Sequence, residues 1–293
     1  MVLMVSRGTL RLMRAIGVLG LVRGCGGVDP GLIALAKLNK VQALVDDRYL
    51  VRYGEFLGFL EHVARRMDGV DYVIVKTMLP LPRIPADIDL IIGGGYLGRV
   101  LGMFRRDGFR LIDWAPYGAT LYSDRYGYYL DVATDLSVSG LVYMDGDYLM
   151  SHSEDRRMDG VVARAPVKPL DLLVVMAHSV IKEWTFTLSD YYAAVLWLSH
   201  ITEALKYAGR LGLVRTLLLF MSVVERLSDM AYGPSNPISA ALRGLTAFNV
   251  DNMLMGELPA RYGLEALLPC YVERFNEEGG HGQRAQSCHV LEA

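Results

Sequence analysis

The stretch from Tyr72 to Ile92 constrains the fold of this chain more than any other. Two short apolar runs, Tyr72 to Val75 and Ile88 to Ile92, flank a segment that contains three prolines. Asp87 and Asp89 lie at the start of the second run. Successive side chains of a strand point to opposite faces of a sheet, so these two carboxylates share a face. The pattern predicts a strand, a loop and a second strand whose first residues have a metal-binding geometry.

The residues after this stretch continue as strands and helices. Apolar spacing predicts a helix at 96–107, and strands are predicted at 108–114, 119–123 and 128–136, the last two joined by a hairpin turn at 124–127. We therefore expect an α+β fold with a small mixed or antiparallel sheet, flanking helices and a C-terminal helical domain.

Helical patterns lie on both sides of this predicted sheet. Helices are predicted at 10–21, 31–44 and 49–67 and, after a polar stretch at 151–160, at 169–184, 188–207, 211–230 and 238–255. The expected division is a helical segment at 1–67 that packs on the core, an α/β core at 68–165, a helical domain at 166–276 and a flexible tail at 277–293. The first helices could form a winged-helix-like DNA reader, but none is rich in Arg, Asn or Gln, which favours the packing role.

Charge and composition exclude several classes of protein. The net charge of −2 over 293 residues gives no overall basic surface for nucleic acid. The three cysteines form no C-x-x-C pair, which favours reduced thiols and a cytoplasmic location. A membrane span needs about 20 uninterrupted apolar residues, and no run of this sequence comes close. The N-terminal apolar run lacks a convincing small-residue cleavage site, which disfavours a signal peptide.

The two carboxylates differ in context from the chain's other Asp-x-Asp, Asp145-Gly146-Asp147, which is predicted to be solvated in a turn. Asp87 and Asp89 begin a buried strand, where ionised carboxylates are costly unless a cation lies against them. Magnesium prefers carboxylate and phosphate oxygens. A two-ion site for phosphoryl or nucleotidyl transfer usually needs a third carboxylate from a neighbouring strand. Asp131 is the predicted third acid, and Asp135, on the same face of a regular strand, is the alternative.

These residues resemble those of a known superfamily. Lys76 after a strand, followed by Arg83-x-x-x-Asp87-Ile88-Asp89-Leu90, resembles the polymerase-β-type nucleotidyltransferases, in particular poorly characterised families with a Lys-Gly segment before R-x-x-x-D-I-D-L. Leu130-Asp131-Val132 resembles their third-acid strand, and the run with His178, Lys182, Trp184 and Asp190 resembles their helical region. The resemblance covers residues 30 to 200, and D-I-D-L is its specific part.

The resemblance implies transfer of a nucleoside monophosphate from an NTP to an acceptor hydroxyl, with two Mg²⁺ ions as cofactors. Asp87, Asp89 and Asp131 would be the catalytic and metal-binding residues. The expected nucleotide-binding residues are Lys76, Thr77, Arg83, His178 and Lys182. The last two are four residues apart and so would share a face of an α-helix. The expected partners are the nucleotide and an acceptor that is a small molecule, an RNA end or a protein side chain, with no membrane and no strong DNA-binding signal.

One segment departs from the superfamily's pattern. The Gly-Ser or Gly-Gly turn whose backbone N–H groups hold the phosphates reads Lys76-Thr77-Met78 here. Losing glycine hinders close backbone approach, while a charge and a hydroxyl could compensate. The alternative function is therefore a non-catalytic nucleotide-binding or regulatory module, with half of a toxin–antitoxin pair as one setting. A third hypothesis, a DNA-binding helical protein with the sheet as scaffold, predicts steeply salt-dependent DNA binding, and the charge balance speaks against it.

Overall fold

The computed structural model describes Leu10, residues 12–14, Ala36, Val41, residues 47–81 and residues 83–243. All of these fall within one compact unit of the chain. Most of the helices predicted at 10–21 and 31–44, the end of the helix predicted at 238–255 and the tail predicted at 277–293 lie outside the described residues. The boundary predicted near residue 165 stays a prediction.

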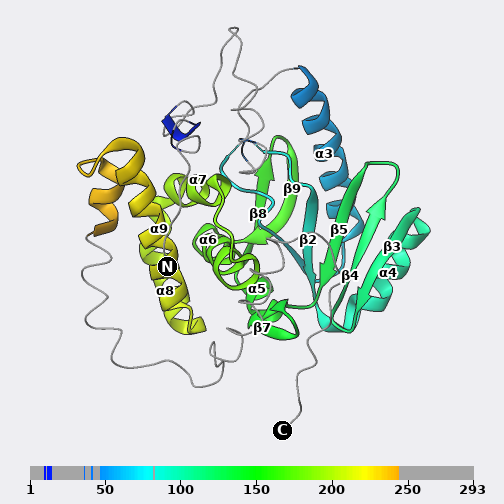
Figure 1. The fold of residues 1–293 in the computed structure, drawn as a ribbon. Coiled ribbons are helices and arrows are strands. Elements are labelled where there is room, and N and C mark those ends of the chain that lie inside the picture. The colour runs from blue at the N-terminus through cyan, green and yellow to red at the C-terminus, as the bar shows by residue number, and fades with distance from the viewer. Residues whose placement is uncertain are drawn as a thin grey trace, which may run out of the picture. The chain divides into compact units, whose positions relative to one another are not determined.

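A five-stranded mixed sheet organises the described residues, with the strand order β1-β2-β5-β4-β3 (Figure 1). The strands are β1 (Tyr72–Val75), β2 (Asp87–Ile92), β3 (Phe109–Ala115), β4 (Gly118–Ser123) and β5 (Tyr128–Ala133). β2 and β5 are parallel, and the other neighbours are antiparallel. The predicted α+β fold with a small mixed sheet, flanking helices and helices after it in the chain is therefore confirmed.

Two helices cover one face of this sheet, α3 (Asp47–Arg66) and α4 (Leu97–Arg106), the second preceded by the 3-10 turn η1 (Gly94–Tyr96) (Figure 1). Their apolar residues, among them Phe59 and Phe104, share a core with Ile74, Leu90 and Leu130 of the sheet. The alternation of side chains along β2 and β5 sends these leucines to the helix-covered face. The aspartates that alternate with them consequently lie on the other face.

The opposite face meets the helical part of the chain, built from α6 (Lys168–Ala177), η2 (His178–Glu183), α7 (Leu188–Leu196), η3 (Leu198–His200), α8 (Ile201–Leu211) and α9 (Val214–Tyr232) (Figure 1). Residues of α6 are buried from Pro169 to Ala177, as expected for a helix that is apolar on all sides. They share a second core with Val73, Val75 and Ile91 of the sheet. Among the described helices, none has the length and apolarity needed to cross a membrane.

The segment between the sheet and α6 holds elements that the sequence analysis did not predict. They are β6 (Leu136–Val138), β7 (Leu141–Met144), α5 (Gly146–Ser151), β8 (Ser153–Met158) and β9 (Val161–Pro166). The stretch at 151–160, which the sequence analysis describes only as polar, provides β8 and the turn of the β8–β9 hairpin, Asp159-Gly160, with φ values of 43° and 95°. Asp145 is exposed as expected, but it caps α5 by accepting the Tyr148 N–H at 2.8 Å.

Gly146 is required by close packing at the start of α5. Its N–H donates to Asp135 at 2.9 Å, and a Cβ there would collide with the Thr134 carbonyl oxygen and approach the Ile91 side chain to 2.9 Å. We expect Gly146→Ala to destabilise the protein by about 1 to 3 kcal/mol, because overpacking forces the backbone to move. Urea unfolding would measure the loss.

Gly209, which is exposed in α8 with open space around its Cα, provides the matched control. Gly209→Ala should stabilise the protein by about 0.5 to 1 kcal/mol, because alanine loses less backbone entropy in a helix. Equal effects of the two substitutions would contradict the close approach at Gly146.

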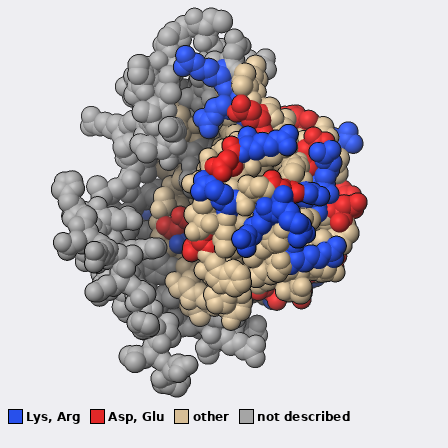
Figure 2. Space-filling model, turned by 90° about the vertical axis from the view of Figure 1, so that its right-hand side faces the viewer, with Lys and Arg blue, Asp and Glu red and all other residues tan. Residues whose placement is uncertain are grey.

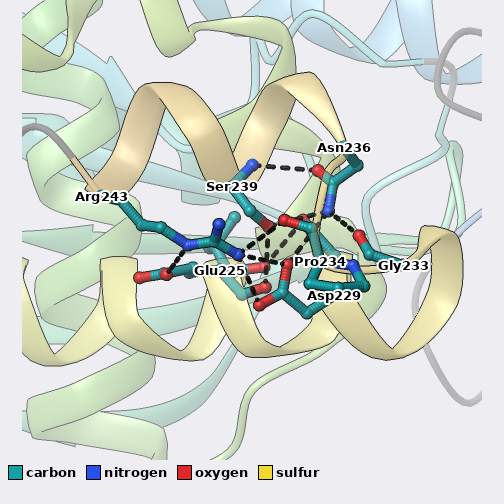
Figure 3. A network of polar contacts seen from close by, with 9 residues as sticks. Glu225, Asp229, Gly233, Pro234, Asn236, Ser239 and Arg243 are labelled. Atoms are coloured by element: carbon teal, nitrogen blue, oxygen red, sulfur yellow. Dashed lines mark hydrogen bonds and ion pairs between the residues drawn. The ribbon is translucent and has the colours of Figure 1, made fainter.

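A polar network ties the last described helical residues, 237–243, to the end of α9 (Figure 3). Arg243 bonds Glu225 and Asp229 of α9, each at 3.0 Å. Asn236 accepts the Ser239 N–H at 2.9 Å, as an N-cap does, and donates to the Gly233 carbonyl at 2.6 Å. The chain therefore reverses direction after α9 through side chains that satisfy both helix ends.

The surface around α4 and the edge strand β3 carries many arginines with acidic residues between them (Figure 2). Arg99, Arg105 and Arg106 of α4 are exposed. Arg110 of β3 pairs with Asp124 at 2.8 Å. On this side of the molecule the basic side chains do not form a continuous basic surface.

Candidate active site

The predicted acids lie in one row of register partners that crosses the sheet. Successive partners in this row are Val75, Asp89, Asp131, Thr120 and Asp113, on β1, β2, β5, β4 and β3. Paired residues point to the same face, and that face is the one that meets the helical part. Asp87 lies two residues before Asp89 on the same face. The structure thus brings Asp87, Asp89 and Asp131 together from two adjacent parallel strands.

The environments of these three carboxylates differ. Burial, followed by the charge of Asp89, raises the pKa of Asp87. Burial also raises the pKa of Asp131, although the Thr120 hydroxyl donates to its carboxylate at 2.6 Å and opposes the rise. For Asp89, burial acts in the same direction, but the ammonium of Lys76 and then His178 outweigh it, so its pKa is lowered. Lys76 and His178 thus favour the ionised form of Asp89.

Lys76 follows β1 directly and turns its side chain into the acid cluster. Its Nζ lies 2.9 Å from Asp89 Oδ2 and 3.2 Å from Nδ1 of His178. Its side chain is only 12% exposed, and its backbone has a φ of 57°, in the region that favours glycine. The predicted nucleotide-binding lysine is therefore an inward-facing cation bound to one of the predicted catalytic acids.

Backbone contacts of Lys76 hold the turn from two sides. Its N–H donates to Asp171 Oδ1 at 3.1 Å, and its carbonyl accepts from Arg83 Nη2 at 2.7 Å. Arg83 also donates to the Ser189 hydroxyl at 3.2 Å, and its burial lowers the pKa of the guanidinium. Arg83, predicted to contact the triphosphate, thus lies where it supports the turn that carries Lys76.

Asp171 of α6 is a residue that the sequence analysis missed. It is fully buried and pairs with Arg156 of β8 at 2.7 Å. Arg156 also donates to the carbonyls of Met78 and Pro166, and its guanidinium lies 5.0 Å from the Trp197 ring centre. A single acid within an otherwise apolar helix was the signal for a buried ion pair. Its partner, Arg156, lies in the stretch at 151–160, which the sequence analysis describes only as polar.

Thr77 is buried and forms a hydrogen bond to the backbone at the end of β1. The side chain is 2% exposed, and its hydroxyl donates to the Val75 carbonyl at 3.1 Å. This bond connects Thr77 to the last residue of β1 and so helps to hold the turn at Lys76.

His178 and Lys182 lie in a segment, residues 178–183, where an α-helix was predicted and the chain instead forms a π-helix. Its i→i+5 spacing pairs His178 with Glu183, at 3.3 Å from Nε2. Burial lowers the pKa of His178. Lys182 is exposed, and its charge lowers the pKa of Asp89 and Asp131. Both residues therefore lie near the acids, in a π-helix and not in the predicted α-helix.

Two other predicted acids have structural partners. Asp190 accepts from the N–H and the hydroxyl of Thr187, at 2.8 and 2.7 Å, and so completes a capping box at the start of α7. Asp135, the alternative third acid, lies beyond the end of β5 and accepts from Gly146 and Thr134. Asp131 is therefore the acid that adjoins Asp89.

The acid cluster fits a divalent cation by its donor chemistry and its charge. Among the described residues no group of three His, Cys, Asp or Glu side chains is arranged to hold a metal ion by itself. Mg²⁺, however, is usually bound through one or two carboxylates together with waters and substrate phosphates. Of the ion pairs among described residues, one joins a cation to this cluster, that of Lys76 with Asp89. Asp87 and Asp131 keep hard oxygens and negative charge that a divalent ion would balance.

Comparison with known proteins finds solved structures of low similarity to this chain. No protein-family profile and no curated protein matches the sequence. The solution structure of the antibiotic-resistance factor ANT(2'')-Ia is similar at 12% identity with a TM-score of 0.41, over 61% of this chain and 98% of that one. The crystal structure of ANT(2'')-Ia in complex with adenylyl-2''-tobramycin is similar at 12% identity with a TM-score of 0.37, over 57% and 97%. Likeness at this level carries no functional assignment, so a function has to be inferred from the acid cluster itself.

Proposed function

We propose that the protein transfers a nucleoside monophosphate from an NTP to an acceptor hydroxyl. The observation that supports this most directly is the placement of Asp87, Asp89 and Asp131 on one sheet face, on two adjacent parallel strands. Desolvated carboxylates gathered in this way repel one another and attract a cation. Nucleotidyl transfer uses such a cation, because charge develops on the phosphates in the transition state.

In its fullest form the proposal has Asp87, Asp89 and Asp131 supply the carboxylates of a two-cation site that holds Mg²⁺. When bound, the metal would lower the pKa of the acceptor hydroxyl and hold the α-phosphate in line with it. The contribution of Asp131 is then proton removal. Burial raises the pKa of Asp131, which makes the carboxylate a stronger base, and the Thr120 hydroxyl donates to it at 2.6 Å.

The flanking cations would serve the triphosphate. Lys182 is exposed, and its charge reaches Asp89 and Asp131, so it could approach a phosphate bound beside them. Arg83 would act indirectly, by holding the carbonyl of Lys76 and thus the turn after β1. The acceptor would enter on the same sheet face, where Tyr129, the register partner of Asp87, is 43% exposed.

One observation favours the alternative, a nucleotide-binding module without transferase activity. Lys76 binds Asp89 at 2.9 Å and so neutralises one of the carboxylates that catalysis would need. Such a module would keep the fold and the phosphate-binding cations but release no pyrophosphate.

Calorimetric titration of the purified protein with the four NTPs tests the proposal. We expect binding that requires Mg²⁺, and Asp89→Ala should weaken it about tenfold or more, which corresponds to about 1.4 kcal/mol. Asp113→Ala serves as the matched control, because Asp113 is exposed at the far end of the same row. Release of pyrophosphate with a panel of acceptors then separates the transferase from the binding module. Absence of NTP binding under every condition would contradict both.

A further inference from the structure

Lys76 is a lysine at a position whose backbone conformation is that of a glycine. Its φ of 57° is unusual for a residue with a side chain. The two hydrogen bonds that fix the turn, one donated to Asp171 and one accepted from Arg83, use only the backbone N–H and carbonyl of Lys76. Glycine would make both contacts with less strain. The turn itself therefore gives no reason for a lysine, and the reason lies in its ammonium group.

That ammonium group is placed as a bound cation would be. Its Nζ lies 2.9 Å from Asp89 Oδ2, and the two His178 ring nitrogens lie at 3.2 and 3.4 Å. The oxygen of Asp89 that faces Lys76 is one that a divalent ion would use. A second positive charge within about 4 Å of this ammonium would be repelled strongly in a poorly solvated site. Lys76 and a metal ion on Asp89 thus compete for the same place.

We propose that the ammonium of Lys76 is a built-in cation that takes the place of one of the two divalent ions, so that this site binds a single divalent ion. The inference rests on the proposed function in so far as the acid cluster is a cation site. The remaining ion would use Asp87 and Asp131, with waters or nucleotide phosphates completing its shell, as Mg²⁺ usually does. Lys76 is then a positioning residue that orients Asp89, and it bears a positive charge that cannot dissociate from the protein.

The test measures Mn²⁺ binding directly, by the electron paramagnetic resonance signal of the free ion, with and without a non-hydrolysable ATP analogue. In the presence of the analogue, wild type should bind one Mn²⁺ per chain, and Lys76→Gly should bind two. Without nucleotide, Lys76→Gly should bind Mn²⁺ about tenfold or more tightly than wild type, because a charge in contact with the site has been removed. Lys76→Met, which keeps the length of the side chain, should show the same gain.

Ser139→Gly is the matched control for the backbone change. Ser139 is exposed and has a φ of 50°, so this variant relieves the same kind of strain away from the acids. It should leave Mn²⁺ binding unchanged. Two ions bound to wild type, or no gain in both Lys76 variants, would overturn the inference even if the protein transfers nucleotides. A gain in both variants without nucleotide binding by any of them would support the inference while contradicting the proposed function.

Discussion

Asp131→Asn is expected to slow nucleotidyl transfer by about 10² to 10⁴-fold, the range that a positioned general base contributes. The amide keeps the size of the carboxylate and can still accept from the Thr120 hydroxyl, which lies 2.6 Å from Asp131. It cannot take up a proton from the acceptor. The loss should therefore appear in kcat, with a rise in the KM for the NTP as well if the carboxylate also holds Mg²⁺. The rate at which the label of an α-labelled NTP passes to the acceptor measures it.

Asp113→Asn is the control for this substitution. Asp113 is exposed, lies beyond Thr120 in the same row of the sheet and undergoes the same chemical change. We expect it to retain the wild-type rate. If Asp131→Asn also retained this rate, Asp131 would not be the base. If it only raised the KM for the NTP, the carboxylate would serve in binding alone.

Asp171→Asn is expected to destabilise the folded protein by about 3 to 5 kcal/mol, the usual cost of removing one partner of a buried ion pair. Asp171 is fully buried, and its loss leaves the guanidinium of Arg156 desolvated without a counter-charge. The urea midpoint should fall accordingly. The carboxylate also accepts the Lys76 N–H, so the remaining folded protein should bind NTP more weakly.

A double variant and a control substitution test whether the loss comes from the buried ion pair. In the double variant Asp171→Leu with Arg156→Met, both charges are gone, and most of the stability should return, because apolar replacement of a buried pair is often neutral. Asp124→Asn breaks the exposed pair with Arg110 and should lower the midpoint far less. A loss at Asp171 no larger than that at Asp124 would mean that water reaches the buried pair.

The parts of the fold that were predictable from the sequence are those with strong local periodicity. β2 is found at the predicted residues, 87–92, because its apolar side chains alternate with acids. α3 and α4 differ from their predicted bounds by one or two residues, because apolar and charged residues separate on opposite sides of each helix. The β8–β9 hairpin was missed because β8 is rich in charged residues and β9 is a short run that ends at a proline. The Asp159-Gly160 turn signal alone indicated it.

The part of the site that lies within a single strand was predictable from the sequence, and the part that depends on contacts between elements was not. Spacing within β2 places Asp87 and Asp89 on one face, whereas the pairing of Asp89 with Asp131 depends on which strands become neighbours. No local sequence pattern indicates that the Lys76 side chain points into the acid cluster or that Asp171 accepts the backbone N–H of Lys76. Those facts follow from α6 packing on the sheet. The π-helical turn after α6 was likewise not predicted from the helical spacing.

The two cores share one sheet, and this has a consequence for how the protein could be divided. Residues 68–165 separated from the rest would lose Asp171, His178 and Ser189, which lie against Lys76 and Arg83. The same cut would expose the sheet face that packs in the second core. The helical part therefore cannot be exchanged for another domain without losing residues that support the acid cluster. Recombination between relatives would have to carry both parts together to preserve the site.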